Sequence, residues 1–273
     1  MSAALRAIQP ERQGSAHGVY YEVHGHGVPL LLGFPLMASH AEIFGANAAA
    51  VRDGFLSRLN GRYRVLIADY PSVGRSRTIP PAELTLERAC ADMLAVADAA
   101  GFGRFAWWGA TFGAVIGMAL AARTDRITAL VNAGWPPLGV PYPAMVKAAM
   151  AQLRDPPPHA RILLRQPGQY AQWGTFYGSI LKDWDSSVVA RIRCPRTVIY
   201  GARAETSVGD LPMPVADWIR SRRGELEAQG WRLAELPGCD SGVVLDPQAL
   251  VPSGLAFLDE VLSDPKLSQE ERK

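Results

Sequence analysis

The stretch that decides the fold is Phe105-Ala106-Trp107-Trp108-Gly109-Ala110-Thr111-Phe112-Gly113-Ala114-Val115-Ile116-Gly117-Met118-Ala119. An apolar run ends at Gly109, and a small-residue helical pattern begins after Thr111. Because Gly109 and Gly113 have no side chains, a strand and a helix can approach closely around Thr111. The stretch predicts a sharp strand-to-helix turn that presents Thr111 at the edge of a sheet. The alternative is an ordinary β-α turn of a Rossmann-like sheet.

The segments on both sides of this turn alternate between two kinds of pattern. An alternating run of β-forming residues predicts a strand at 18–24, and short apolar runs predict strands at 28–32, 64–68, 127–133, 197–200 and 231–236. Apolar positions at helical spacing predict helices at 41–59, 86–97, 215–228 and 249–262. Such alternation is typical of an α/β fold with a mostly parallel sheet between two layers of helices.

One segment, residues 135–193, interrupts the alternation. It contains clustered prolines and a dense set of aromatic residues: Tyr142, Tyr170, Trp173, Phe176, Tyr177 and Trp184. Linkers do not carry so many large apolar groups. We therefore expect an inserted helical cap at 135–193, a core formed by 15–134 and 194–263, and a frayed tail at 264–273.

The composition of the chain indicates which binding partners and which cellular compartment to expect. Of 273 residues 48% are hydrophobic and 20% charged, and the net charge is +2, so neither nucleic acid nor an acidic surface is expected as partner. The N-terminus shows no signal-peptide pattern and no apolar run is long enough to span a membrane. Three scattered cysteines predict no metal site and favour the cytoplasm. No G-x-G-x-x-G follows a strand, so a dinucleotide is not expected, and we expect no cofactor. The sequence leaves open whether the protein forms a homodimer.

Several motifs together carry a family resemblance. Asp69-Tyr70-Pro71-Ser72-Val73-Gly74-Arg75-Ser76 is similar to a D-x-x-G-x-G-x-S turn, and Gly109–Gly113 is similar to the G-x-S-x-G nucleophile elbow. The strand ending at Gly201 and the loop Leu236-Pro237-Gly238-Cys239 follow at the expected distances. Residues 18–262 therefore resemble an α/β-hydrolase of the epoxide-hydrolase and esterase type, which implies the α/β-hydrolase fold with an inserted cap.

The departures from that family concern the catalytic triad. Thr111 stands where the nucleophilic serine belongs, and Ser241 stands where the histidine belongs. No histidine follows His159, although the triad of this fold runs in the order serine, acid, histidine. Loss of the base alone lowers kcat by roughly 10⁶ in a serine hydrolase, which is about 8 kcal/mol of barrier. The triad is degenerate, and ordinary ester hydrolysis through Thr111 is not expected.

Other parts of the site survive these changes. The resemblance implies an oxyanion hole formed by the backbone N–H groups of Phe34 and Phe112, which side-chain substitutions leave in place. The resemblance and the aromatic content of the cap also predict the lining of a pocket. We expect this pocket to be lined by Trp108, Ala110, Trp135, Tyr142, Trp173 and Tyr177.

Four further side chains are candidates for acid–base or polar roles, and three of them have a plain structural alternative. His40 follows the oxyanion loop, but it could equally be a solvent-facing residue at a helix N-terminus. Asp240 could act as a base if it were desolvated, or it could only form a turn. Ser241 belongs to the same loop. Glu205 lies one residue past the usual position of the acid, at Ala204, and could be a surface residue.

These observations favour a protein that acts on a small apolar or aromatic organic molecule. Because the triad is absent, we expect cofactor-free, non-hydrolytic chemistry of a lyase, isomerase or cyclase. An atypical hydrolase of esters, lactones or epoxides, which uses Thr111 or an activated water, is the second hypothesis. A non-catalytic binding protein that retains the pocket is the third.

Overall fold

The computed structural model describes residues 8–164, 166–180 and 182–263, so the predicted tail at 264–273 lies outside the described residues. Its centre is an eight-stranded sheet in the order β1-β2-β4-β3-β5-β6-β7-β10. The strands are β1 Arg12–Ala16, β2 Val19–His24, β3 Val28–Leu32, β4 Tyr63–Ala68, β5 Phe105–Ala110, β6 Ile127–Ala133, β7 Arg196–Gly201 and β10 Trp231–Leu236. Only the β1–β2 and β2–β4 pairs are antiparallel, which confirms the predicted mostly parallel sheet.

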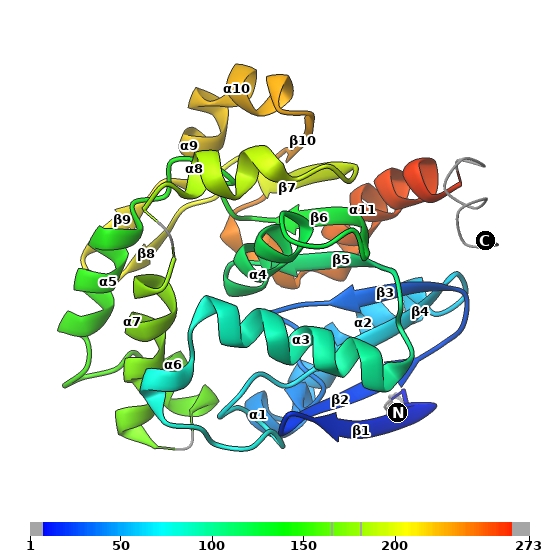
Figure 1. Ribbon diagram of the computed structural model, residues 1–273, viewed down its shortest axis with the longest axis horizontal. Helices are drawn as coiled ribbons and strands as arrows, with labels where there is room; N and C mark the ends of the chain where they lie inside the picture. Colours follow the sequence, from blue (N-terminus) through cyan, green and yellow to red (C-terminus); the bar gives the residue numbers. More distant parts are fainter. Residues whose placement is uncertain (1–7, 165, 181, 264–273) are drawn as a thin grey trace.

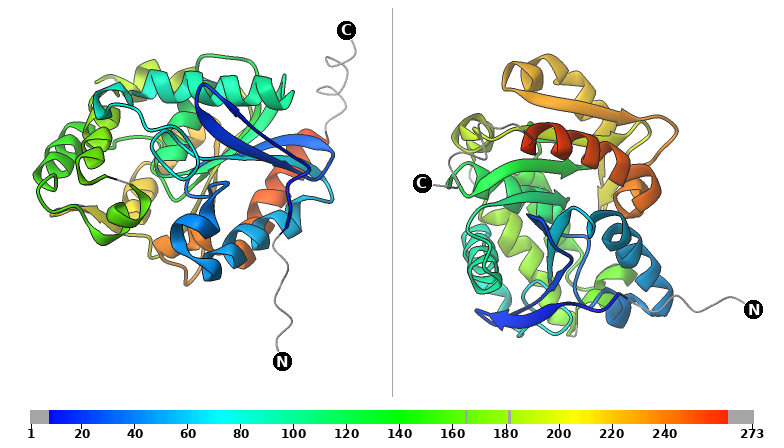
Figure 2. Two further views of the ribbon diagram at one scale, coloured as in Figure 1. Left: turned by 90° about the horizontal axis from the view of Figure 1, so that it is seen from below. Right: turned by 90° about the vertical axis from the view of Figure 1, so that its right-hand side faces the viewer.

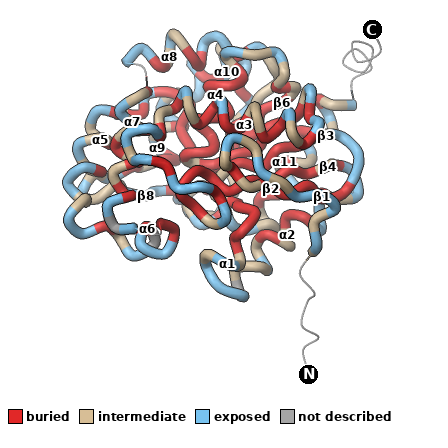
Figure 3. The backbone as a smooth tube through the Cα atoms, turned by 60° about the horizontal axis from the view of Figure 1, so that its bottom comes forward, coloured by how far each residue is buried: buried red, intermediate tan, exposed pale blue. Residues whose placement is uncertain are grey.

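Helices cover both faces of the sheet, as Figures 1 and 2 show. On one face lie α3 (Leu86–Ala100) and α4 (Phe112–Ala121), and on the other lie α2 (Ala49–Leu59) and α11 (Pro247–Leu262). Each face has its own cluster of buried apolar side chains, and the buried strands and α4 form the centre of the molecule in Figure 3. No helix among the described residues is both long and apolar enough to cross a membrane.

Between β6 and β7 the chain forms a group of short helices, here called the insertion (residues 134–195). Its elements are α5 Tyr142–Ala151, α6 Pro158–Leu163, η3 Pro167–Tyr170, α7 Ala171–Gly178, α8 Trp184–Ser187 and η4 Val189–Arg191. Gln169 ties the insertion to the loop that follows β4, because its Nε2 lies 2.9 Å from Ser72 Oγ and 3.0 Å from the Ile79 carbonyl oxygen. Val73 also forms a β-bridge with Leu164.

Two predicted helices are divided in the structure. The one expected at 41–59 consists of α1 (His40–Phe44), η1 (Ala46–Ala48) and α2, and it breaks at Gly45, whose φ is 91°. The one expected at 215–228 is divided at Arg222 into α9 (Val215–Ser221) and α10 (Arg223–Ala228). Apolar spacing persists across both breaks, so periodicity alone did not reveal them.

Several short elements carried no signal in the sequence. The edge strand β1 is mostly exposed and therefore lacks an apolar pattern, yet it extends the sheet to Arg12, ahead of the core boundary expected at residue 15. A hairpin of β8 (Thr206–Val208) and β9 (Leu211–Met213) follows β7. The turns η2 (Pro81–Glu83) and η5 (Ser241–Leu245) complete the described elements.

Candidate functional site at the strand-to-helix turn

Thr111 lies between β5 and α4, at the sharp turn that the sequence predicts. Its backbone angles are φ 46° and ψ −117°, a conformation that a β-branched residue adopts only under strain. A Cβ placed on Gly109 would lie 2.6 Å from the Gly113 backbone, and one placed on Gly113 would lie 2.6 Å from the Phe34 nitrogen. The two glycines therefore allow the strand, the helix and the loop after β3 to meet at one point.

The Thr111 hydroxyl makes no hydrogen bond. Its Oγ1 is buried and has no partner among the described residues. A threonine nucleophile needs a base within hydrogen-bond reach, because the hydroxyl is weakly nucleophilic at its ordinary pKa. The structure presents the hydroxyl of Thr111 to the site without such a base.

Of the two backbone N–H groups expected at the oxyanion hole, one already has a hydrogen-bond acceptor and the other has none among the described residues. The Phe34 N–H donates to the Tyr70 hydroxyl at 2.9 Å, while the Phe34 carbonyl accepts from the Ala110 N–H at 2.7 Å. The Phe112 N–H, at the start of α4, has no acceptor among the described residues. The amide of Phe112 also lies at the positive end of the α4 dipole, which favours a negatively charged oxygen.

Tyr70 was not recognised from the sequence as a site residue, although it belongs to the Asp69–Ser76 motif. Its ring packs edge-on against Phe112, with centroids 4.9 Å apart, and its side chain is buried. Burial raises the pKa of the Tyr70 phenol, so the hydroxyl stays protonated at neutral pH. Its oxygen accepts the Phe34 N–H, and no acceptor for its own proton occurs among the described residues.

Asp69 holds this tyrosine and the following turn in place. Its carboxylate accepts hydrogen bonds from the Ser39 N–H at 2.9 Å, the Ser39 hydroxyl at 2.6 Å and the Arg75 N–H at 2.9 Å. Burial nevertheless raises the pKa of Asp69, because desolvation outweighs these bonds. Asp69 is thus a structural anchor for the loop that positions Tyr70.

His40 is buried at the start of α1, so the interpretation of a solvent-facing residue does not hold. Burial, together with the nearby Arg52 cation, lowers the pKa of His40 to about 4. The imidazole is therefore neutral at neutral pH and packs against Phe44, with ring centroids 4.9 Å apart. Its Nδ1 has no hydrogen-bond partner, and neither has Thr111 Oγ1, so the two groups are not hydrogen-bonded to each other.

In the loop after β10, neither Asp240 nor Ser241 is hydrogen-bonded to Thr111. Asp240 is exposed and accepts a hydrogen bond from the Gly242 N–H at 2.8 Å, which is the turn-forming role and not the desolvated carboxylate of a base. The Ser241 hydroxyl donates to the backbone carbonyl of Glu205. The side chain of Glu205 is exposed. Ser241 and Glu205 thus meet only through the backbone carbonyl of Glu205, and the Glu205 carboxylate takes no part in this contact.

Four of the six residues expected to line a pocket form one aromatic cluster with the first residues of α4. Trp173 and Phe176 pack on Phe112, with ring centroids 5.1 Å and 4.1 Å away. The cluster continues to Tyr177, Tyr142 and Trp135 through ring contacts and a 3.5 Å contact from Trp135 Nε1 to the Tyr142 hydroxyl. The insertion therefore places its aromatic side chains directly over the residue that follows Thr111.

Trp108 and Ala110 do not belong to that aromatic cluster. Successive side chains of a strand point to opposite faces, and these two face α2 and α11. Trp108 packs against Phe55 at 6.3 Å between ring centroids. Both residues border a cavity of about 10 Å³ on that face. Trp107, which was not predicted, faces α4 instead and donates from Nε1 to the Gly113 carbonyl at 3.0 Å.

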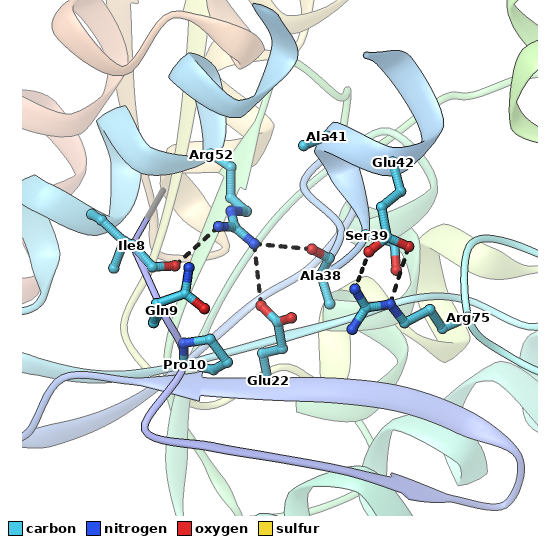
Figure 4. A pocket seen from close by; sticks show the side chains of 10 residues that line it. All are labelled: Ile8, Gln9, Pro10, Glu22, Ala38, Ser39, Ala41, Glu42, Arg52 and Arg75. Atoms are coloured by element: carbon cyan, nitrogen blue, oxygen red, sulfur yellow. Dashed lines mark hydrogen bonds and ion pairs between the residues drawn. The ribbon is translucent and has the colours of Figure 1, made fainter. Parts of the chain in front are cut away.

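A larger cavity of about 220 Å³ lies away from the turn, beside residues 8–10. Figure 4 shows its charged lining. Arg52 bonds Glu22 at 3.2 Å and the carbonyls of Ala38 and Ile8, whereas Arg75 pairs with Glu42. Because each of these charges has a partner within the protein, the cavity presents no unpaired charge to a ligand. No group of three or more potential metal-binding side chains occurs among the described residues.

One curated relative matches part of the chain. A putative carbamate hydrolase, RutD, from Azorhizobium caulinodans is 35% identical over 130 residues, which are 46% of this chain and 44% of that protein. The chain thus spans less than half the length of this relative.

Solved structures agree on the architecture. A hydrolase from Pseudomonas aeruginosa matches with a TM-score of 0.62 and 24% identity, covering 88% of this chain and 94% of that one. An epoxide hydrolase from Vigna radiata matches with a TM-score of 0.67 and 14% identity over 95% and 100% of the two chains. A family model described as alpha/beta hydrolase fold matches residues 37–202. Together with the mostly parallel sheet and the Thr111 turn, this match shows that the chain belongs to the α/β-hydrolase fold family.

Proposed function

We propose that this protein binds a small apolar or aromatic carbonyl compound at the Thr111 turn and activates it by hydrogen bonds, without cofactor and without hydrolysis. The observation that carries the proposal is the set of donors at this point, two of them without a partner among the described residues. The Thr111 hydroxyl and the Phe112 N–H lack partners, and the Phe34 N–H holds an uncharged oxygen. Such donors stabilise negative charge that develops on a carbonyl oxygen.

The lack of a base hydrogen-bonded to Thr111 limits which reactions these donors can support. Acyl transfer through Thr111 would need a hydrogen-bonded base, and the hydroxyl has none. Lyase or cyclase reactions that need only a polarised carbonyl, such as decarboxylation of a β-keto acid, place no such demand on the protein. They fit a site that consists of hydroxyl and amide donors among aromatic rings.

The proposal gives the segment 135–193 the role of a cap. Its support is the hydrogen bonding of Gln169 to Ser72 and the packing of Trp173 and Phe176 on Phe112. Trp173 is only half-buried, so its ring is the group that a ligand would displace on entering. Cys90, Cys194 and Cys239 are free thiols, in keeping with the proposed cytoplasmic location.

A hydrolase is the second candidate, because the relatives described above are named as hydrolases. In such an enzyme Thr111 or an activated water would be the nucleophile, although Thr111 Oγ1 is hydrogen-bonded to no base among the described residues. The two hypotheses predict activity on different substrates, and nucleophilic hydrolysis would also require the Thr111 hydroxyl, so they can be told apart.

The test compares decarboxylation of benzoylacetate with hydrolysis of 4-nitrophenyl acetate. We expect the wild-type protein to accelerate benzoylacetate decarboxylation and Thr111→Trp, which fills the site, to abolish that acceleration while circular dichroism shows a folded chain. Ester hydrolysis should stay near the uncatalysed rate and be unaffected by Thr111→Ala. An esterase rate that collapses in Thr111→Ala would instead establish the hydrolase hypothesis.

A further inference from the structure

Tyr70 is a buried residue of the site whose hydroxyl proton takes no part in the function proposed above. Its hydroxyl oxygen occupies the position at which a ligand oxygen would meet the Phe34 N–H, at 2.9 Å from that nitrogen. The hydroxyl lies close to the chain at Gly33, since a Cβ placed on Gly33 would be 3.3 Å from it. A side-chain hydroxyl therefore already fills one half of the oxyanion hole.

The proton of the Tyr70 hydroxyl has no hydrogen-bond acceptor among the described residues. Tyr70 is 2% exposed, so water does not reach its ring freely, and no acceptor for the O–H occurs among the described residues. An unmade hydrogen bond at a buried group costs about 1 to 3 kcal/mol. Thr111 Oγ1 is a second buried hydroxyl, and it makes no hydrogen bond at all among the described residues. Two buried hydroxyl groups, one bonded to the Phe34 N–H and one on the residue before Phe112, thus have unmade hydrogen bonds and indicate a place for a ligand oxygen.

The surrounding contacts hold these donors together. A Cβ placed on Gly113 would lie 2.6 Å from the Phe34 nitrogen, so the first turn of α4 adjoins the peptide that binds the Tyr70 hydroxyl. The rings of Tyr70 and Phe112 are in edge-to-face contact, with an angle of 88° between their planes. The Tyr70 hydroxyl and the Phe112 N–H thus belong to one small region.

We propose that Tyr70 takes over from the Phe34 N–H as a donor to the ligand, so that the ligand's carbonyl or enolate oxygen is bound by the Tyr70 hydroxyl and the Phe112 N–H, with Thr111 beside them. The inference rests on the function proposed above. The Phe34 N–H then acts through Tyr70, because a hydroxyl that accepts one hydrogen bond becomes a stronger donor of the next. The ligand oxygen lies one hydroxyl farther from Gly33 than in a hole formed by two backbone amides.

This arrangement determines which ligands are accepted. The tyrosine ring fills the space beside Phe112, so the carbonyl compound must place its oxygen beyond that ring and its apolar part against Trp173 and Phe176. A planar aromatic molecule with one terminal oxygen meets both demands. The chemical class is therefore an aryl ketone, its enolate, or a phenolate that imitates the enolate.

The experiment measures binding of 4-nitrophenolate by its absorbance change, with 4-nitroanisole as the neutral probe that has no anionic oxygen. The proteins are the wild type, Tyr70→Phe and the control Tyr63→Phe, which loses a buried hydroxyl bonded to Asp259 on the opposite face of the sheet. We expect Tyr70→Phe to bind 4-nitrophenolate at least about tenfold more weakly, since a hydrogen bond to a charged group is lost. Its affinity for 4-nitroanisole and both affinities of Tyr63→Phe should equal those of the wild type.

The other outcomes are distinct. Equal or tighter binding of 4-nitrophenolate by Tyr70→Phe would show that the hydroxyl only fills the hole, which overturns the inference and leaves the proposed function standing. An equal loss of affinity for both probes would show a purely structural role and overturn it as well. If neither probe binds the wild-type protein, the proposed function falls, and the inference falls with it.

Discussion

At the scale of single residues, the strained backbone of Thr111 is the clearest mark of the site. A non-glycine residue in such a region costs about 1 to 3 kcal/mol, and β-branching adds to the difficulty. The strain persists because Gly109, Gly113 and the loop at Phe34 determine the turn around it. Threonine at position 111 therefore strains the backbone, and we infer that its side chain is retained for the site and not for stability.

Replacing Thr111 by glycine should therefore stabilise the protein. Glycine adopts positive φ without strain, and after its greater freedom in the unfolded chain is subtracted we expect a net gain of about 1 kcal/mol. Urea denaturation of the wild type and Thr111→Gly measures this difference. Thr175→Gly in α7, where φ is not positive, is the control and should lose about 0.5 to 1 kcal/mol. Equal losses in both variants would contradict the assigned strain.

At the scale of elements, the site depends on how closely the loop after β3 approaches the start of α4. Sequence patterns located β3, β5 and α4 well, because each is a continuous apolar run. They did not establish which side chains of β5 face α4, although period-two alternation separates Trp107 from Trp108. Both neighbours are tryptophan, so composition did not distinguish the two faces.

The close approach at Gly113 is testable with a matched pair of substitutions. Gly113→Ala would place a Cβ 2.6 Å from the Phe34 nitrogen, and the backbone there has little room to move. We expect a loss of about 3 kcal/mol or more, as for severe overpacking. Gly224→Ala in α10 meets nothing within 4 Å and should be neutral or stabilising by up to about 1 kcal/mol. Thermal unfolding of the two variants gives the comparison, and similar melting temperatures would argue against a closely packed turn.

At the scale of the whole molecule, buried ionisable groups make the free energy of unfolding depend on pH. The pKa of His40 falls to about 4 in the folded chain because of burial, against an ordinary value of 6.5. Between these two pH values the unfolded chain binds a proton that the folded chain does not. The contribution of neutral His40 to stability is therefore present above pH 6.5 and is lost as pH falls toward 4.

The variant His40→Gln isolates this contribution from those of other groups. Glu22, whose pKa is lowered, and Asp69, whose pKa is raised, act in opposite directions and remain in both proteins. Between pH 7 and pH 4 we expect the wild type to lose about 3 kcal/mol more than His40→Gln in urea denaturation. Parallel pH profiles for the two proteins would mean that His40 is protonated freely in the folded state.

The sequence alone determined the layered α/β architecture, the family and the place of the Thr111 turn, because apolar periodicity and glycine spacing are local properties of the chain. It also showed that no histidine follows His159. Only the tertiary structure decided which groups meet at the turn. Tyr70, 41 positions before Thr111 in the numbering, reaches the Phe34 N–H, whereas Asp240 remains at the surface. Such pairings depend on loop conformation and on the order of strands in the sheet, which short-range sequence patterns do not encode.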